Sequence, residues 1–288
     1  MSTLPNSAIK VSHALSGSLQ ALRYRKLVLL AGAVCVLLAL MGVLGSLVAP
    51  YSPNAINVLD ASQGISVHHV LGTDSLGRDI FSRVLAGARL SLLGPAIVTV
   101  LATCLGTFAA IYSTWRGGKA EALIARGLDI LFAFPGILIA ILAVAVFGPG
   151  LLAPALALSV AYTPYIARVI HSVSVRERHL PYIESCQLLG YSPWRTCVGH
   201  LLKNVKSMIG AQASLTFAYA LLDLSALSFI GLGVQPPASD WGQMVASGAA
   251  DVLNGSPQEA LAGGAAIMIT VVALNLLGES LIASSGLS

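Results

Sequence analysis

The sequence has few charged residues. Asp, Glu, Lys and Arg make up only 10% of its 288 positions, whereas hydrophobic residues make up 56%. A soluble domain needs roughly a quarter of its residues charged to keep its surface hydrated. The deficit excludes a fold whose surface faces water on all sides, and it predicts an integral membrane protein.

Motifs typical of enzymes and nucleotide-binding proteins are also missing. No GxxxxGK[ST] run exists, so the chain cannot bind ATP through a P-loop. There is no Gly-x-Ser-x-Gly elbow and no HExxH. The 16 Lys and Arg form no block of five or more, which argues against nucleic acid as a partner. We therefore expect no catalytic residues and no cofactor bound by this chain.

The cysteines and the adjacent histidines do not form a recognisable metal site. The four cysteines, Cys35, Cys104, Cys186 and Cys197, contain no CxxC pair. The first two lie in apolar runs, where cysteine behaves as a small hydrophobe. The other two lie in a segment expected in the cytoplasm, where disulfides are rare. His68-His69 has no cysteine or carboxylate cluster beside it, and we expect neither a disulfide nor a metal ion.

Six apolar segments have the length, roughly 17–25 residues, that a helix needs to cross a bilayer. Lipid offers no partner for an unpaired backbone amide, so each span should be helical. The first segment is too long for the apolar core of a secretory signal, and no small-residue cleavage site precedes Pro50. The six are Leu27–Ala49, Leu92–Tyr112, Leu123–Phe147, Leu151–Ile170, Met208–Leu232 and Ala260–Ala283.

The basic residues are distributed unevenly between the segments that join these spans. Of the 16 Lys and Arg, 13 lie in residues 1–26, 113–126 and 168–207, and the other three lie in residues 50–91. Cytoplasmic loops carry the excess of positive charge. We therefore expect the N-terminal segment and the tail 284–288 in the cytoplasm, and residues 50–91 outside.

The extracytoplasmic segment contains a candidate helix. Thr73 and Asp74 are suited to cap a helix from Ser75 to about Arg89. Its apolar residues share one face, and two acid–base pairs follow at i,i+4 spacing. The pairs are Asp74–Arg78 and Asp79–Arg83. We expect an amphipathic helix that lies along the outer membrane surface.

The cytoplasmic loop of residues 171–207 is too long to lack structure. Pro181 suits the first turn of a helix and Gly190 its left-handed C-terminal cap. Ser192 then suits the N-cap of a second helix from Pro193 to about Leu202. The pattern predicts two short helices at about 181–202, which form a rigid protrusion able to convert a partner's movement into helix tilt. A surface hairpin without a partner is the alternative.

Part of this protrusion resembles a known motif. Glu184-Ser185-Cys186, followed by Gly190, is similar to the E-A-A-x-x-x-G motif of ABC importer permeases, whose coupling helix docks into a groove of the ATPase. Ser185 and Cys186 replace two alanines, and Lys203 stands where the family generally has proline. Three further blocks resemble dipeptide, oligopeptide and nickel permeases of the C-subunit type. They are Gly72–Leu92, Asp129–Gly136 and Leu227–Gly242.

The resemblance implies a fold and a set of partners. The fold is that of a type I ABC importer permease, an all-α membrane protein with a core of five spans in residues 92–283, after the first span. The partners are a homologous second permease, two cytoplasmic ATPases that bind ATP and Mg²⁺, and an extracytoplasmic solute-binding protein. Such a complex lies in the bacterial cytoplasmic membrane. Peptides are the commonest solute of the family, with nickel, glutathione and other small solutes as alternatives. The residues that would contact the ATPase or shape the contact are Glu184, Ser185, Gly190, Tyr191, Ser192 and Trp194.

Polar residues within the spans are the candidates for a translocation path. Asp223 lies about 15 residues into the fifth span, where an ionised carboxylate is costly unless it faces water or a partner. It either lines the path, where it would meet a substrate amine, or accepts a hydrogen bond from a neighbouring helix. Asn275 has the same two readings, and Glu279 lies near the cytoplasmic end. Pro135 and Pro164 are expected to kink their helices.

Two other classes of protein rank lower. A stand-alone secondary transporter would favour paired buried charges and an inverted repeat, but Asp223 is the only carboxylate near mid-membrane and no repeat is clear. An intramembrane enzyme would need a nucleophile with its base, or metal ligands, at membrane depth. No histidine falls within the six predicted spans.

Overall fold

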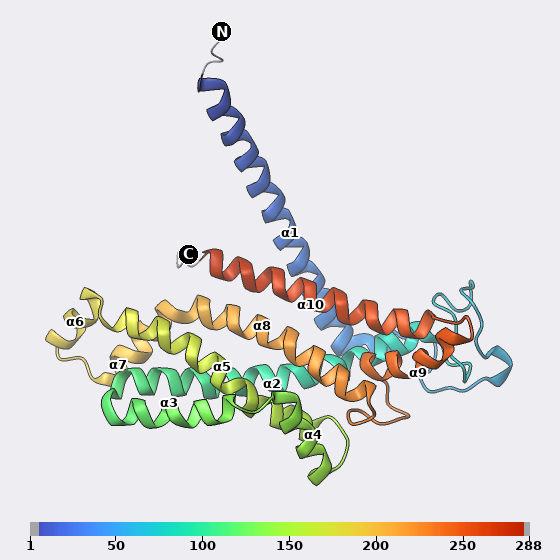
Figure 1. Ribbon diagram of the computed structural model, residues 1–288. Coiled ribbons are helices and arrows are strands. Elements are labelled where there is room, and N and C mark those ends of the chain that lie inside the picture. Colours follow the sequence, from blue (N-terminus) through green and yellow to red (C-terminus); the bar gives the residue numbers. More distant parts are fainter. Residues whose placement is uncertain (1–5, 285–288) are drawn as a thin grey trace, which may run out of the picture.

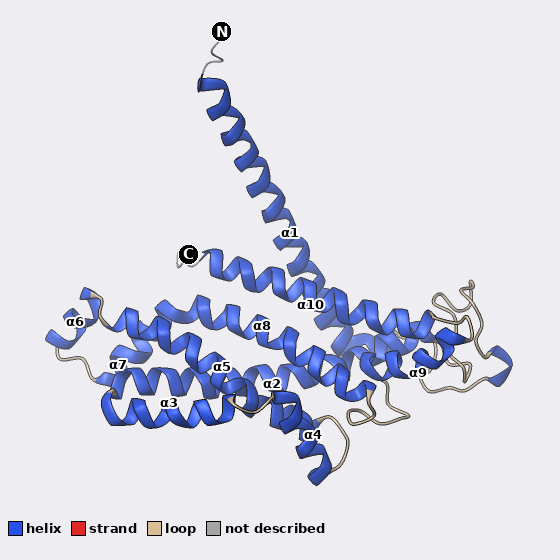
Figure 2. Cartoon of the chain, in the orientation of Figure 1, coloured by secondary structure: helices blue, strands red, loops and turns tan. Residues whose placement is uncertain are grey.

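The computed structural model describes residues 6–284, and within these residues the chain is helical with no β-strand (Figures 1 and 2). Ten α-helices are present in this part of the chain, together with one short 3-10 helix, Val58–Asp60, and one π-helical turn, Cys197–Leu201. The α-helices are α1 Asn6–Val48, α2 Ile80–Arg116, α3 Gly118–Phe132, α4 Gly136–Phe147, α5 Leu152–Arg178, α6 Pro181–Leu188, α7 Pro193–Thr196, α8 Leu202–Phe229, α9 Trp241–Leu253 and α10 Gln258–Ser284.

Four long helices, α2, α5, α8 and α10, form the body of the bundle, and α1 leaves it at an angle (Figure 1). The most extensive contact joins α2 and α5. Small residues allow this close approach, because a Cβ at Gly106 would lie only 2.9 Å from the Cβ of Ile166. The core where α2, α4, α5 and α8 meet contains Val98, Ala140, Ala155, Leu158, Ala220, Leu224 and Leu227.

Most of the predicted spans correspond to helices that are long and apolar enough to cross a membrane. Four single helices qualify, α1, α2, α5 and α10, and a fifth span results if the bent pair α3–α4 is counted as one. The remaining predicted span corresponds to α8, which has 28 residues but carries polar side chains such as Gln212 and Asp223. The described structure is therefore an all-α, multi-span bundle, and a total of six spans stays a prediction.

The predicted third span is broken rather than straight. Between α3 and α4 the chain bends by 75° at Ala133–Pro135, and α4 turns away from the bundle (Figure 1). Pro135 has no N–H to donate and disfavours helical backbone at Phe134. The expected kink at Pro135 is thus a complete break, whereas α5 stays one continuous helix through Pro164.

The prediction of an amphipathic helix from Ser75 to Arg89 on the outer surface is wrong. The helix begins at Ile80, Asp79 caps it by accepting the backbone N–H of Ser82, and it continues without a break to Arg116. Residues Thr73 to Asp79 form a tight turn instead, in which Gly77 adopts φ +74° and its N–H donates to the Asp74 carbonyl, and a Cβ at Gly77 would clash with the backbone of Asn57. The core therefore begins at residue 80 rather than at residue 92.

Four charged residues of this segment, Asp74, Arg78, Asp79 and Arg83, are also buried rather than facing water, whereas Arg89 is exposed. The guanidinium of Arg83 is completely buried, 3.5 Å from Glu259 of α10 and 3.7 Å from Asp74. Arg78 lies 2.6 Å from Asp74, so this predicted pair forms, although not on a helix. Asp79 contacts His69 at 2.9 Å instead of Arg83. The charges tie the segment before α2 to the first turns of α2 and α10.

The helix α9 lies at the same end of the bundle as residues 49–79, and α6 and α7 lie at the opposite end (Figure 1). The sequence did not predict a helix within residues 233–259. The α9 helix is fixed to α2 through Trp241, which is buried: its backbone N–H donates to Ser91 Oγ at 2.9 Å and its indole N–H donates to the Val84 carbonyl at 3.0 Å. At this end α2, α9, α10 and the segment before α2 are therefore joined by buried contacts.

Candidate functional site

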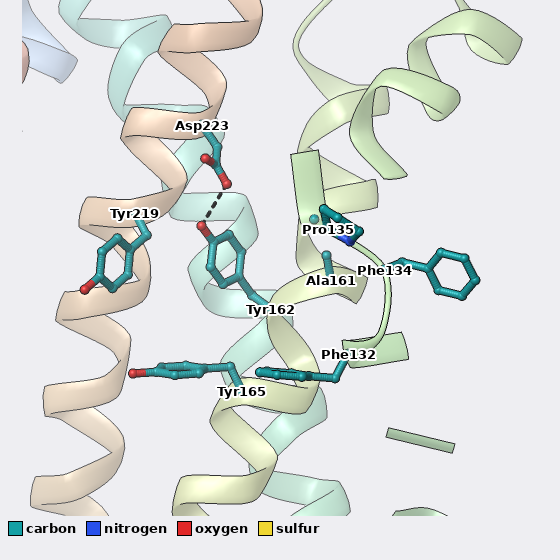
Figure 3. Close-up of a pocket in the computed structure, with 9 residues that line it drawn as sticks. Phe132, Phe134, Pro135, Ala161, Tyr162, Tyr165, Tyr219 and Asp223 are labelled. Atoms are coloured by element: carbon teal, nitrogen blue, oxygen red, sulfur yellow. Dashed lines mark hydrogen bonds between the residues drawn. The ribbon is translucent and has the colours of Figure 1, made fainter. Parts of the chain in front are cut away.

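A cavity of about 440 Å³ lies where the α3–α4 break meets α5 and α8 (Figure 3). Five aromatic rings line it, and Asp223 is the one charged residue among the described lining residues. In Figure 3 Tyr165 and Phe132 lie across one end of the space, below the Asp223 carboxylate. The lining residues are Phe132, Phe134, Pro135, Gly136, Ala161, Tyr162, Tyr165, Tyr219 and Asp223.

Asp223 is held by one hydrogen bond across the bundle. The hydroxyl of Tyr162 on α5 donates to Asp223 Oδ2 on α8 at 2.8 Å (Figure 3). Tyr219 lies one turn before Asp223 on α8, and Tyr165 lies three residues after Tyr162 on α5. Asp223 therefore joins two helices, as one of the two predictions held, and it also lines the cavity, while its place on a translocation path stays a prediction.

A basic residue stands beside the cavity but does not line it. Arg168 lies over the ring of Phe132 at 4.5 Å from its centroid and pairs with Asp129 at 2.8 Å. Both members of this pair are more than half exposed. The charge of Arg168 is thus neutralised by Asp129, and the Asp223 carboxylate faces the cavity without a cationic partner among the described residues.

The structure does not bring Asn275 to this cavity. Asn275 lies on α10, is half-buried, and is not among the residues that line the space around Asp223. Helix α10 packs instead against α8, α9 and α1. Both Asp223 and Asn275 were predicted to line a translocation path, but only Asp223 lines this cavity.

The predicted cytoplasmic protrusion is a distinct unit at one end of the bundle. Helix α6 packs through Ile183 and Cys186, which are buried, and exposes Glu184 and Ser185. Gly190 adopts φ +75°, and the N–H of Tyr191 donates to the Cys186 carbonyl at 3.0 Å, the bond of a left-handed helix cap. The predicted turn at Gly190 is confirmed.

The other residues predicted to contact a partner lie around this turn. Tyr191 is half-buried, with the guanidinium of Arg195 4.4 Å above its ring. Ser192 is exposed, and its Oγ accepts the backbone N–H of Arg195 at 3.3 Å, as expected of an N-cap. The side chain of Trp194 lies outside the described residues.

Sequence reasoning missed the most exposed apolar residues of the protrusion. Leu188 and Leu189 are 89% and 72% exposed at the end of α6. The available signal in the sequence was a pair of leucines directly before Gly190, at the predicted end of a short helix outside the bilayer. Large exposed apolar side chains of this kind mark a surface for a partner.

The second predicted helix of the protrusion does not end at Leu202. Helix α7 has only four residues, and the π-helical turn Cys197–Leu201 then leads directly into α8. The buried side chains of Cys197 and Leu201 pack beneath the protrusion, which favours continuation over a chain reversal. The second helix of the protrusion, α7, is therefore continuous with α8, the helix that carries Asp223.

Hydrogen bonds also join the protrusion to α5. The hydroxyl of Tyr182 donates to Glu177 at 2.8 Å, and the amide of Asn204 on α8 donates to the same carboxylate oxygen at 3.3 Å. Burial raises the pKa of Tyr182 to about 12, with the bond to Glu177 acting in the same direction. Glu177 thus connects α5, α6 and α8 at the base of the protrusion.

These features define a class of protein: a multi-span helical membrane protein with a mid-bundle cavity and a helical protrusion at one end. Residues 102–284 match the family described as binding-protein-dependent transport system inner membrane component. The chain belongs to this family.

Relatives with assigned names are similar over most of the chain. The chain is 35% identical to the probable D,D-dipeptide transport system permease protein DdpC of Escherichia coli, over 86% of this chain and 83% of that one. It is 37% identical to the glutathione transport system permease protein GsiD of Pectobacterium atrosepticum, over 76% of this chain and 73% of that one.

A solved structure shares the fold. An inward-facing form of the MetNI methionine ABC transporter contains a chain that matches with a TM-score of 0.55 and 17% identity, over 70% of this chain and 95% of that one. The likeness supports the type I permease fold.

Proposed function

We propose that this chain is the membrane-spanning permease subunit of an ATP-driven importer and that it moves peptides into the cell by alternating access. In this proposal the chain itself has no catalytic residues, and partner ATPases bind ATP and Mg²⁺. Family membership supports the transport role.

One observation carries the mechanism. The two helices that flank the protrusion, α5 and α8, are the same two helices that hold Tyr162 and Asp223. A force applied at residues 181–201 therefore reaches the cavity through two rods that are linked at their base by Glu177 and at the cavity by the Tyr162–Asp223 hydrogen bond. Closure of a partner ATPase pair would tilt these rods and change which side of the membrane the cavity faces.

The expected partners follow from this arrangement. Two cytoplasmic ATPases would bind the protrusions of this subunit and of a homologous second permease, and a solute-binding protein would deliver substrate at the end that holds α9. The uneven distribution of Lys and Arg supports a cytoplasmic location for the protrusion and for both termini.

Peptides are the proposed solute because the named relatives transport a dipeptide and glutathione, which is itself a tripeptide. Glutathione and nickel are the alternatives within the same family. The described residues that line the cavity offer one carboxylate and tyrosine hydroxyls. Imidazole and thiol groups, which suit Ni²⁺ better, are not among them.

The test is reconstitution of the complete importer, with both permeases, the ATPases and the binding protein, in lipid vesicles. We expect ATP-dependent accumulation of labelled dipeptide, and its loss when the Glu184–Gly190 segment is replaced by a flexible Gly-Ser sequence of equal length. Labelled glutathione and ⁶³Ni²⁺ are assayed in parallel. Accumulation of either in place of dipeptide would reassign the solute, and uphill transport by this chain without ATPases would overturn the whole proposal.

A further inference from the structure

We propose that the cavity around Asp223 recognises a free ammonium group, so that the permease itself favours solutes with an unblocked amine. This inference rests on the proposed import function and narrows its substrate class. It is carried by the geometry of the carboxylate, by the aromatic lining and by the distribution of charge around the cavity.

The carboxylate of Asp223 retains capacity to accept a hydrogen bond. Tyr162 donates to Oδ2, and Oδ1 accepts no hydrogen bond from the described residues. An ionised carboxylate has about four lone-pair sites, so at least one oxygen remains for a ligand. A primary ammonium has three N–H donors, and a charge-assisted bond to a carboxylate is about twice as strong as a neutral one.

The aromatic lining suits the same ligand. Tyr162, Tyr165, Tyr219 and Phe132 line a space that is large enough for a small peptide rather than a single ion, while the ring of Phe134 is directed away from Asp223 (Figure 3). The faces of aromatic rings attract cations even at partly exposed sites, which this one is, since Tyr165, Tyr219 and Phe132 are 38%, 47% and 49% exposed. Anionic groups receive no such support here, because no cationic side chain lines the cavity in the described part of the chain.

The charge next to the cavity reinforces this selectivity. The nearest arginine, Arg168, is paired with Asp129 at 2.8 Å and lies over Phe132, so its charge is compensated. Asp223 therefore sets the sign of the potential inside the cavity. A free α-amino group is also what dipeptides and glutathione have in common, although they differ in length and in net charge.

Charged thiol reagents measure this potential without the binding protein, which would otherwise impose its own selection. In the assembled importer the four native cysteines are replaced by serine and Ala161, which lines the cavity, by cysteine. We then compare the labelling rates of a trimethylammonium and a sulfonate methanethiosulfonate reagent. The ratio of the cationic to the anionic labelling rate should be roughly tenfold larger than the same ratio for free cysteine in solution, as expected for a nearby partly screened carboxylate.

The ratio of the cationic to the anionic labelling rate should fall to the value for free cysteine in solution when Asp223→Asn is added. With Asp223→Glu the higher ratio should persist. Asp251→Asn is the matched control, because it removes a carboxylate that lies on α9 and outside the lining. Free Ala-Ala should also slow labelling of Ala161→Cys by a neutral reagent, whereas N-acetyl-Ala-Ala should not. A preference that Asp223→Asn leaves unchanged, or equal protection by both dipeptides, would overturn the inference.

Dipeptide uptake separates this inference from the proposed function. Charge preference and amine-dependent protection without any ATP-dependent dipeptide uptake would leave the ammonium site standing and overturn the transport assignment. If the Asp223→Asn variant still takes up dipeptide and still prefers solutes with a free amine, the transport assignment stands and the ammonium site is overturned.

Discussion

The two ends of this molecule are built in opposite ways. At the end that holds α9, charged side chains are buried and paired, as Arg83 is with Glu259 and Asp74. At the other end, α6 leaves leucines and an acid in water, with Leu188 89% exposed. Large apolar side chains are exposed at both ends, with Val67 97% and Leu253 90% exposed at the first, so the difference lies in the charges. At the first end they are paired within the chain, and at the second Glu184 is exposed. We call the first end, with residues 49–79 and α9, the anchor, and the second end, with α6 and α7, the lever.

The largest effect should come from breaking the buried charges. Arg83→Met would leave Glu259 buried without its partner, at a cost of about 3–5 kcal/mol, because an unpaired buried charge is strongly unfavourable. The midpoint of thermal unfolding of the detergent-solubilised protein measures this. Arg168→Met removes an arginine from an exposed pair and should cost at most about 1 kcal/mol. Equal losses in both variants would remove the distinction between anchor and lever.

A second prediction compares the two halves of helix α1. A Cβ at Gly45 would lie 2.1 Å from the backbone oxygen of Leu85, so Gly45→Ala should cost about 1–3 kcal/mol or force α1 away from α2. Gly32, on the same helix but towards the other end, has open space around it, and Gly32→Ala should stabilise the helix by about 0.5–1 kcal/mol. The same unfolding assay should therefore give changes of opposite sign. Destabilisation by both variants would mean that α1 is packed along its whole length.

A third prediction concerns the turn of the protrusion. Gly190 has φ +75° with open space around it, so Gly190→Ala is penalised by backbone conformation alone, by about 1–2 kcal/mol. The cost should be local and should appear as faster hydrogen exchange in residues 181–191, with little change in global unfolding. Gly199→Ala, in the π-helical turn and also in open space but without a positive φ, should leave exchange in residues 181–191 unchanged. A drop in the global midpoint for Gly190→Ala would show that the lever is part of the core.

The smallest effect is expected at the cap of α9. Asp240 accepts the N–H of Gln243 at 2.9 Å and the hydroxyl of Ser228 at 2.8 Å. An Asn can cap a helix equally well, so Asp240→Asn should be nearly neutral, while Asp240→Ala should cost about 1 kcal/mol.

The cap should also respond to pH. Burial raises the pKa of Asp240, so its protonated form is favoured in the folded protein. Its contribution to stability should therefore be complete below about pH 4, the ordinary value for Asp, and decline as the pH rises through the raised pKa. Thermal midpoints across this range should show the decline in the natural protein, whereas Asp240→Asn should lack this component.

Sequence reasoning succeeded where the signal was local. The apolar spans follow from composition, and the turn of the protrusion follows from Pro181, Gly190 and Pro193, because each restricts its own backbone. The false outer helix shows the limit of such reasoning. Its residues carry good capping and i,i+4 signals, but Gly77 has φ +74° rather than a helical angle, and it lies so near the backbone of Asn57 that a Cβ would not fit there. That contact joins positions 20 apart, and no local pattern reports it.

The cavity was only partly predictable for the same reason. Asp223 stands out as an acid within an apolar span. Its partner Tyr162 lies 61 positions earlier, on a helix whose rotation is set by packing against α2. The i,i+3 spacing of Tyr162 and Tyr165 and the i,i+4 spacing of Tyr219 and Asp223 were the available signals. Asn275 lies on α10, where the packing against α8, α9 and α1 could not be inferred from spacing.

The π-helical turn Cys197–Leu201 has a consequence for how this chain tolerates length changes. A π turn is an α-helix that has absorbed one extra residue. Removing a residue within the turn would convert it to ordinary helix and leave the rotation of α8 as it was. Removing one between Leu202 and Leu222 would rotate Asp223 by about 100° relative to the preceding chain and away from Tyr162. The chain thus has a spare residue at the base of its protrusion, and a one-residue deletion within this turn should be accommodated there.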